Sequence, residues 1–169
     1  KWMAGSDILS RTQRNQAGSA EETADAKTFV QIAITYKGKD ITIYRNGQVY
    51  AQYNAGNGPL EFDAQSAVTI GMRHLDQRDS ARFAGAIDDA RIYSQALSAE
   101  QIAALKPNES SDLKPVAWWT FDDDKATDRA GRFKAVKLEG GAKVEAGRLL
   151  LDGKDATMIA TTGKVYPVT

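Results

Sequence analysis

The sequence predicts an all-β protein: an antiparallel two-sheet β-sandwich of the jelly-roll kind with one short helix near residues 99–105. Two observations predict this fold class. Short segments rich in β-branched and aromatic residues recur along most of the chain, with Gly- or Asn-containing turns about every 8–12 residues. One segment, residues 98–105, carries the signature of a helix.

The first strong strand signals form a meander. Residues 29–36 are rich in β-branched and aromatic side chains, residues 41–44 follow a Lys-Gly-Lys-Asp turn, and residues 49–53 complete the set. Asn46-Gly47 joins the last two segments and is a strong hairpin signal, because both central positions of a type I′ turn need a positive φ. We therefore expect three antiparallel strands.

Two more strands are expected before the helix. Residues 67–71 form the first, and residues 83–93 read as one long strand with Ile87 and Ile92 as apolar anchors. The odd spacing of these anchors suggests a bulge near the Asp pair at positions 88–89.

The helix and the remaining strands follow. Ser98 and Gln101 form a capping box, and Pro107 ends the helix. Adjacent Trp118 and Trp119 lie in the next strand, so one indole is expected in the core and the other outside, as a packed cover or a sugar-stacking surface. The expected strands are 116–121, 134–138, 142–145, 148–151 and 156–160.

Composition excludes several classes of protein. The 169 residues include 22 Lys and Arg and 22 Asp and Glu, so the formal charge is zero. This balance argues against nucleic-acid binding and against a polybasic membrane binder. The absence of cysteine excludes disulfides and thiolate metal sites. Both ends look cut, so we expect a piece of a longer protein, and the missing signal peptide says little about location.

Two stretches resemble the laminin-G-like, concanavalin A-like jelly-roll superfamily. Ile-Thr-Ile-Tyr-Arg-Asn-Gly at 41–47 and Phe-Ala-Gly-Ala-Ile-Asp-Asp-Ala-Arg-Ile-Tyr at 83–93 match the hairpin and closing signature of that family. Trp-Trp-Thr-Phe-Asp-Asp at 118–123, with Leu-Leu-Leu-Asp-Gly at 149–153, is similar to its opening.

The order of the two halves is therefore inverted. Residues 1–106 resemble the closing half, residues 113–169 resemble the opening half, and residues 107–112 link them. The chain is either a circular permutant that forms one sandwich over residues 1–169 or the junction of two tandem modules. We expect one sandwich, because a lone half would leave a long unpaired edge.

The resemblance implies a non-catalytic carbohydrate-binding module of a secreted or periplasmic bacterial glycoside hydrolase. The opening motif is similar to modules of family 32 fructan-cleaving enzymes. The expected partners are a poly- or oligosaccharide and adjacent domains of a longer parent chain. One alternative is a structural or protein-interaction sandwich without a sugar site. A third reading, a glycan-cleaving enzyme, needs a carboxylate pair across a cleft.

Candidate sugar-binding residues lie in polar segments beside the meander. Sugar recognition uses planar donors such as guanidinium and amide groups against vicinal hydroxyls, with an aromatic face beneath the ring. Without a sugar site, residues 11–16 would be a solvated strand and loop, and His74 would be a surface histidine near Asp76. The candidate carbohydrate-binding residues are Arg11, Gln13, Arg14, Tyr44, Arg73 and His74.

Acidic clusters supply candidate metal ligands. In the resembled family, a carboxylate after the opening strand and one in the closing strand often meet at a structural calcium ion, which takes six to eight oxygen ligands. The alternative is a solvated turn at residues 122–124 and an ion pair from Asp89 to Arg91 or Arg129. The candidate ligands are Asp88, Asp89, Asp122, Asp123 and Asp128.

Overall fold

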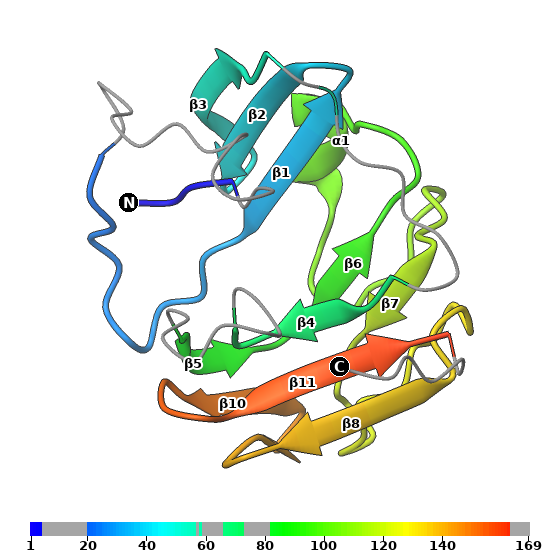
Figure 1. Ribbon diagram of the computed structural model, residues 1–169. Helices are drawn as coiled ribbons and strands as arrows, with labels where there is room; N and C mark the ends of the chain where they lie inside the picture. The colour runs from blue at the N-terminus through cyan, green and yellow to red at the C-terminus, as the bar shows by residue number, and fades with distance from the viewer. Residues whose placement is uncertain (5–19, 57, 59–65, 73–81, 163–169) are drawn as a thin grey trace. The chain divides into compact units, whose positions relative to one another are not determined.

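The computed structural model describes residues 1–4, 20–56, 58, 66–72 and 82–162 (Figure 1). Within these ranges the structure has eleven strands and one short helix, and every strand pair is antiparallel. The predicted all-β class with one helix is therefore confirmed. The sequence Asp-Ile-Leu-Ser-Arg-Thr at residues 7–12 also predicts a strand, and it lies outside the described residues.

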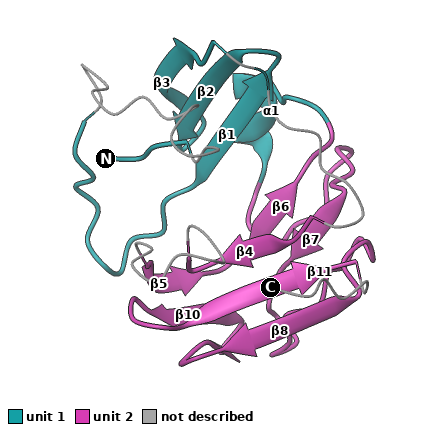
Figure 2. Ribbon diagram, viewed as in Figure 1, with its two compact units in different colours: residues 1–61, 95–105 teal, residues 62–94, 106–169 magenta. Residues whose placement is uncertain are grey.

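The chain divides into two compact units (Figure 2). Unit 1 contains Lys1–Glu61 and Gln95–Leu105, and unit 2 contains Phe62–Ser94 and Lys106–Thr169. No helix in the described part of the chain is long and apolar enough to cross a membrane.

The sheet of unit 1 is the predicted meander. Its strands β1 (Ile32–Lys37), β2 (Asp40–Arg45) and β3 (Gln48–Asn54) follow each other in space as in sequence. Asn46 has φ 50° and Gly47 has φ 74°, as the hairpin signal requires. β2 lies in the centre of the sheet, and its Ile41 and Ile43 side chains are fully buried.

The helix of unit 1, α1 (Ala99–Ala104), begins with the predicted capping box. The Ser98 hydroxyl accepts the Gln101 N–H at 3.2 Å, and the Gln101 side chain accepts the Ser98 N–H at 2.8 Å. The β2–β3 turn packs closely on this helix, because a Cβ added to Gly47 would lie 2.6 Å from the Ala103 Cβ. Glycine at position 47 therefore satisfies both the turn and the packing.

A carboxylate anchors the N-terminal residues to the sheet of unit 1. The Trp2 indole N–H donates to Glu22 at 2.7 Å, and the Arg45 guanidinium donates to both carboxylate oxygens of Glu22 at 2.7 and 3.0 Å. Hydrogen bonds from Arg45 and then Trp2 hold the pKa of Glu22 well below its ordinary value. The N-terminal residues are therefore held to β2 by an ion pair and a hydrogen bond.

Unit 2 contains three small sheets around one core. The strand orders are β5-β10-β9, β4-β11-β8 and β6-β7. These strands are β4 (Val68–Ile70), β5 (Ala84–Ile87), β6 (Ala90–Ile92), β7 (Ala117–Trp119), β8 (Ala135–Glu139), β9 (Lys143–Glu145), β10 (Arg148–Asp152) and β11 (Thr157–Thr161). The core is formed by Ala117, Trp119, Phe121, Phe133, Leu149, Leu151, Ala156, Met158 and Ala160.

The prediction of one long strand over residues 83–93 is wrong. The chain bends at Asp88, so that β5 pairs with β10 and β6 pairs with β7. The odd spacing of Ile87 and Ile92 therefore marks a change of sheet and not a bulge.

Unit 2 brings together strands from both resembled stretches. β5 and β6 come from the closing signature, and they pair with β10 and β7 from the opening signature. A single sandwich over residues 1–169, with 1–106 and 113–169 as its two halves, stays a prediction.

Candidate functional site

The candidate site of unit 2 is built on Trp118 in β7. The adjacent Trp119 is buried in the core, so Trp118 points outward, as the alternation predicts. The Trp118 backbone N–H donates to Asp128 at 2.8 Å, and its C=O accepts the Arg129 N–H at 2.7 Å. Both backbone hydrogen bonds of Trp118 are therefore made with the segment at residues 128–129 and not with β6. Arg91 in β6 lies directly opposite Trp118 and forms a non-hydrogen-bonded pair with it. Such non-hydrogen-bonded pairs bring their side chains close together.

Two guanidinium groups flank the Trp118 indole. The Arg91 guanidinium carbon lies 4.5 Å from the indole ring centroid, and that of Arg129 lies 5.2 Å from it. The two groups come from opposite sides of β7, since Arg91 belongs to β6 and Arg129 to the segment that bonds the other edge. Cation–π attraction at these distances stabilises the stack.

Arg91 is fixed by a dense set of acceptors. Its guanidinium bonds the Asp89 carboxylate at 2.9 Å through two nitrogens and donates to the Lys106 and Glu109 carbonyls at 2.9 Å. Burial opposes the charge, but the hydrogen bonds and charge interactions with Asp89 and Tyr93 together outweigh burial and raise the pKa of Arg91 above its ordinary value. Arg91 is therefore a permanently charged, immobile wall of the site.

Asp89 orients the ring as well as Arg91. Its Oδ2 also accepts the Trp118 indole N–H and the Asn108 backbone N–H, each at 2.9 Å. One carboxylate thus fixes the indole, the guanidinium and the loop after α1. This confirms the ion pair from Asp89 to Arg91 that the sequence offered as the alternative to a metal ligand.

A small cavity opens beside this stack. Its volume is about 190 Å³. None of its lining residues carries a carboxylate, and those with polar or aromatic side chains are Arg91, Ser110, Ser111, Lys114, Trp118 and Arg129. The cavity therefore combines an aromatic ring with hydrogen-bond donors and hydroxyl groups.

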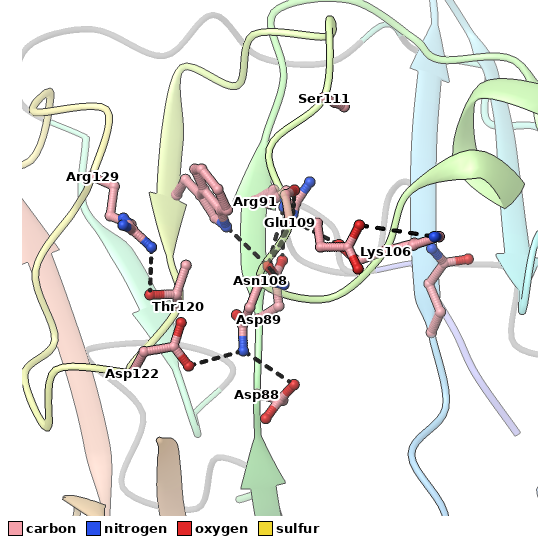
Figure 3. Close-up of polar contacts among 12 residues, drawn as sticks. Asp88, Asp89, Arg91, Lys106, Asn108, Glu109, Ser111, Thr120, Asp122 and Arg129 are labelled. Atoms are coloured by element: carbon pink, nitrogen blue, oxygen red, sulfur yellow. Dashed lines mark hydrogen bonds and ion pairs between the residues drawn. The ribbon is translucent and has the colours of Figure 1, made fainter. Parts of the chain in front are cut away.

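The predicted metal ligands lie near this site but bond to protein donors. The Asn108 side-chain amide donates to Asp88 at 3.4 Å and to Asp122 at 3.2 Å (Figure 3), and Arg148 lies 3.6 Å from Asp88. Asp128 is buried and accepts four backbone N–H groups, from Trp118, Ala130, Arg132 and Phe133.

Protein donors already bond three of the five candidate carboxylates, those of Asp89, Asp123 and Asp128. Asp89 is used by Arg91, Asp128 by backbone groups, and Asp123 by the Lys125 N–H at 3.3 Å. Among the described residues, no three His, Cys, Asp or Glu side chains form a group that could hold a metal. Calcium binding stays a prediction.

The predicted sugar-binding residues are mostly beyond the described structure. Arg11, Gln13, Arg14, Arg73 and His74 lie outside the described residues. Tyr44 lies in β2 with its residue 8% exposed, so little of its ring is accessible. These six assignments stay predictions.

Sequence reasoning missed Arg91, Arg129 and Lys114 as site residues. The sequence indicated Arg91 and Arg129 only as possible ion-pair partners of Asp89. The missing information was the pairing of β6 with β7, which places Arg91 opposite Trp118 across 26 intervening residues. No local pattern reveals that pairing.

A second cavity in unit 2 is larger, at about 790 Å³. It lacks tryptophan and arginine, and its floor is largely aliphatic, with Val136, Leu138 and Val144 among the lining residues. Lysines 125, 134 and 143 and the carboxylates of Asp124 and Asp128 also line it. The cavity therefore combines aliphatic side chains with charged groups of both signs.

These observations define an antiparallel β-protein with a small aromatic and arginine-lined pocket. The family model of the concanavalin A-like lectin/glucanases superfamily matches residues 5–103, which is more than half of the chain. The chain belongs to this superfamily. No curated protein and no solved structure matches it. Residues 113–169, which resemble the opening half, lie outside the family match.

Proposed function

We propose that the protein binds a poly- or oligosaccharide without cleaving it, as an accessory module of a secreted or periplasmic glycoside hydrolase. The observation that carries this proposal is the Trp118 pocket in a member of a lectin and glucanase superfamily. Trp118 lines the pocket together with guanidinium and hydroxyl groups, and these groups match sugar hydroxyls.

The acidic side chains support binding rather than cleavage. Asp88 and Asp122 lie close together, since both accept hydrogen bonds from the Asn108 amide nitrogen. Neither carboxylate lines the Trp118 pocket or the larger cavity. The carboxylates that line the larger cavity are Asp124 and Asp128, and Asp128 is buried and accepts four backbone N–H groups. A glycosidase needs two carboxyl groups that face each other across the bound sugar.

Affinity electrophoresis tests this function. Gels containing levan, inulin or other neutral and acidic polysaccharides are compared with a gel without polysaccharide. The fructans are included because the opening motif resembles modules of fructan-cleaving enzymes. We expect the protein to be retarded by at least one glycan, and Trp118→Ala to lose most of that retardation.

Phe29→Ala is the matched control, because Phe29 is an exposed aromatic residue of unit 1. It should bind as the wild type does. Absence of retardation in every gel would overturn the proposal. Release of sugar from any bound glycan would instead show that the protein is a glycan-cleaving enzyme.

The second candidate function is docking of a neighbouring domain. The aliphatic floor of the larger cavity favours it, because such surfaces mark protein contacts more often than sugar sites. Leu138→Lys, at a residue 36% exposed in that cavity, separates the two functions. It should leave glycan retardation unchanged and weaken docking to a neighbouring domain of the parent chain.

A further inference from the structure

The charges around the Trp118 pocket are strongly one-sided. Three cationic side chains line it, those of Arg91, Lys114 and Arg129, and no carboxylate does. The whole chain carries no net formal charge, so this local excess is a property of the site. A pocket for a neutral sugar has no need of such an excess.

The three cations are not equivalent. Arg91 is neutralised by Asp89 at 2.9 Å, and its side chain is 7% exposed. Arg129 is exposed, and the bond that its side chain makes, to the Thr120 hydroxyl, is long at 3.4 Å (Figure 3). Among the described residues, no carboxylate pairs with Arg129 or Lys114. Two cations thus remain available to a ligand.

We propose that the Trp118 pocket selects an acidic sugar residue, whose carboxylate pairs with Arg129 and Lys114. This inference rests on the proposed carbohydrate-binding function and names the class of glycan. Guanidinium groups bind carboxylates in a bidentate fashion, and such charge-assisted bonds are stronger than those between neutral groups. Ser110 and Ser111 line the same pocket, where the Ser111 hydroxyl donates to the Leu113 carbonyl at 3.2 Å and can still accept a hydrogen bond from a ring hydroxyl.

The size of the pocket limits the ligand to one sugar unit of a chain. Pockets for drug-sized ligands have volumes of roughly 300–1,000 Å³, whereas this one has about 190 Å³. Arg91 cannot move to enlarge it, because Asp89 and two backbone carbonyls hold the guanidinium. Arg129 is held by one long bond, so it is the group that adjusts to the carboxylate.

The experiment compares matched glycans. Binding of the protein to a panel of uronate polymers, such as polygalacturonate, alginate and hyaluronan, is measured by affinity electrophoresis and calorimetry. Each polymer is used beside its carboxyl-reduced form, which keeps the same backbone without the charge. We expect at least one uronate polymer to bind about tenfold or more tightly than its reduced form, a difference of about 1.4 kcal/mol.

Paired variants assign the effect to the pocket. Arg129→Gln and Lys114→Gln should each weaken uronate binding several-fold and weaken binding to the reduced polymer by a smaller factor. Arg132→Gln and Lys154→Gln remove the same charges at exposed positions outside the pocket, and should bind as the wild type does. Urea unfolding of each variant confirms that the fold is kept.

The outcomes separate this inference from the proposed function. Equal binding of the charged and reduced polymers, or binding to neutral glycans alone, overturns the acidic-sugar assignment and leaves carbohydrate binding in place. Equal losses of uronate binding in the pocket variants and the control variants also overturn the assignment, because they show that the net charge of the protein attracts the polymer. Binding to no glycan of either kind overturns both.

Discussion

Arg91 and Trp118 face each other across β6 and β7, and the carboxylate of Asp89 accepts a hydrogen bond from each of them. The guanidinium and the indole are therefore oriented by one acceptor two residues from Arg91 in sequence. The site is rigid for this reason: its aromatic surface is fixed before any ligand arrives.

Asp89→Asn tests the importance of this acceptor. The variant leaves the largely buried Arg91 charge without its counter-ion, and we expect the free energy of unfolding of unit 2 to fall by about 2–4 kcal/mol. Urea unfolding followed by tryptophan fluorescence measures the change. Asp123→Asn is the control, because Asp123 is exposed and accepts one long bond. Similar stability of both variants would contradict the role given to Asp89.

Gly47→Ala and Gly38→Ala form a matched pair. Both glycines have positive φ, 74° and 60°, but an added Cβ would clash with Ala103 only at position 47, whereas nothing lies within 4 Å at position 38. We expect Gly38→Ala to cost about 1–2 kcal/mol from backbone strain alone and Gly47→Ala to cost more. Thermal and urea unfolding measure both. Equal losses would show that the β2–β3 turn does not pack on α1 as described.

Glu22→Gln tests a pH dependence in unit 1. Bonds from Arg45 and Trp2 hold the pKa of Glu22 below its ordinary value of 4.5, so the folded state favours the charged form. Its contribution to stability is complete above that value and is lost as the pH falls from 4.5 toward the lower pKa of the folded state.

The free energy of unfolding of the wild type should therefore exceed that of Glu22→Gln near neutral pH, and the gap should close in strong acid. Urea unfolding at a series of pH values measures the gap. Both Glu22 and Arg45 are partly exposed, so added salt should also narrow it. A gap that is constant down to pH 2 would contradict the account of the low pKa.

Removal of divalent metal tests the calcium expectation. Protein groups already satisfy the candidate carboxylates, so we expect EDTA to leave the melting temperature and any glycan retardation unchanged. Calorimetry with and without EDTA measures this. A fall in the melting temperature that calcium chloride restores would establish the ion that the family resemblance implies.

Local features of the fold were predictable from sequence. The Asn46-Gly47 hairpin and the Ser98 cap depend on residues next to each other in the chain, and both were placed correctly. The break at Asp88 was read as a bulge, because the partners of β5 and β6 lie far away in sequence.

Prediction of the candidate site also required knowing which distant strands pair with each other. The outward position of Trp118 followed from alternation along one strand. Its guanidinium neighbours did not, because Arg91 reaches it through strand pairing and Arg129 through a loop that folds back onto β7. The residues chosen from sequence were selected by chemistry alone, without knowledge of which segments meet.

The division of the chain into units has a practical consequence. Each unit is assembled from two separated pieces: residues 62–94 interrupt unit 1, and residues 95–105 interrupt unit 2. A single cut after Glu61 leaves a continuous fragment that holds all of unit 2 together with residues 95–105 of unit 1, whereas every continuous fragment that holds all of unit 1 also holds residues 62–94 of unit 2. Expression of unit 1 alone would need a new covalent joint between its two pieces, whereas truncation from the N-terminus up to residue 61 removes residues of unit 1 only.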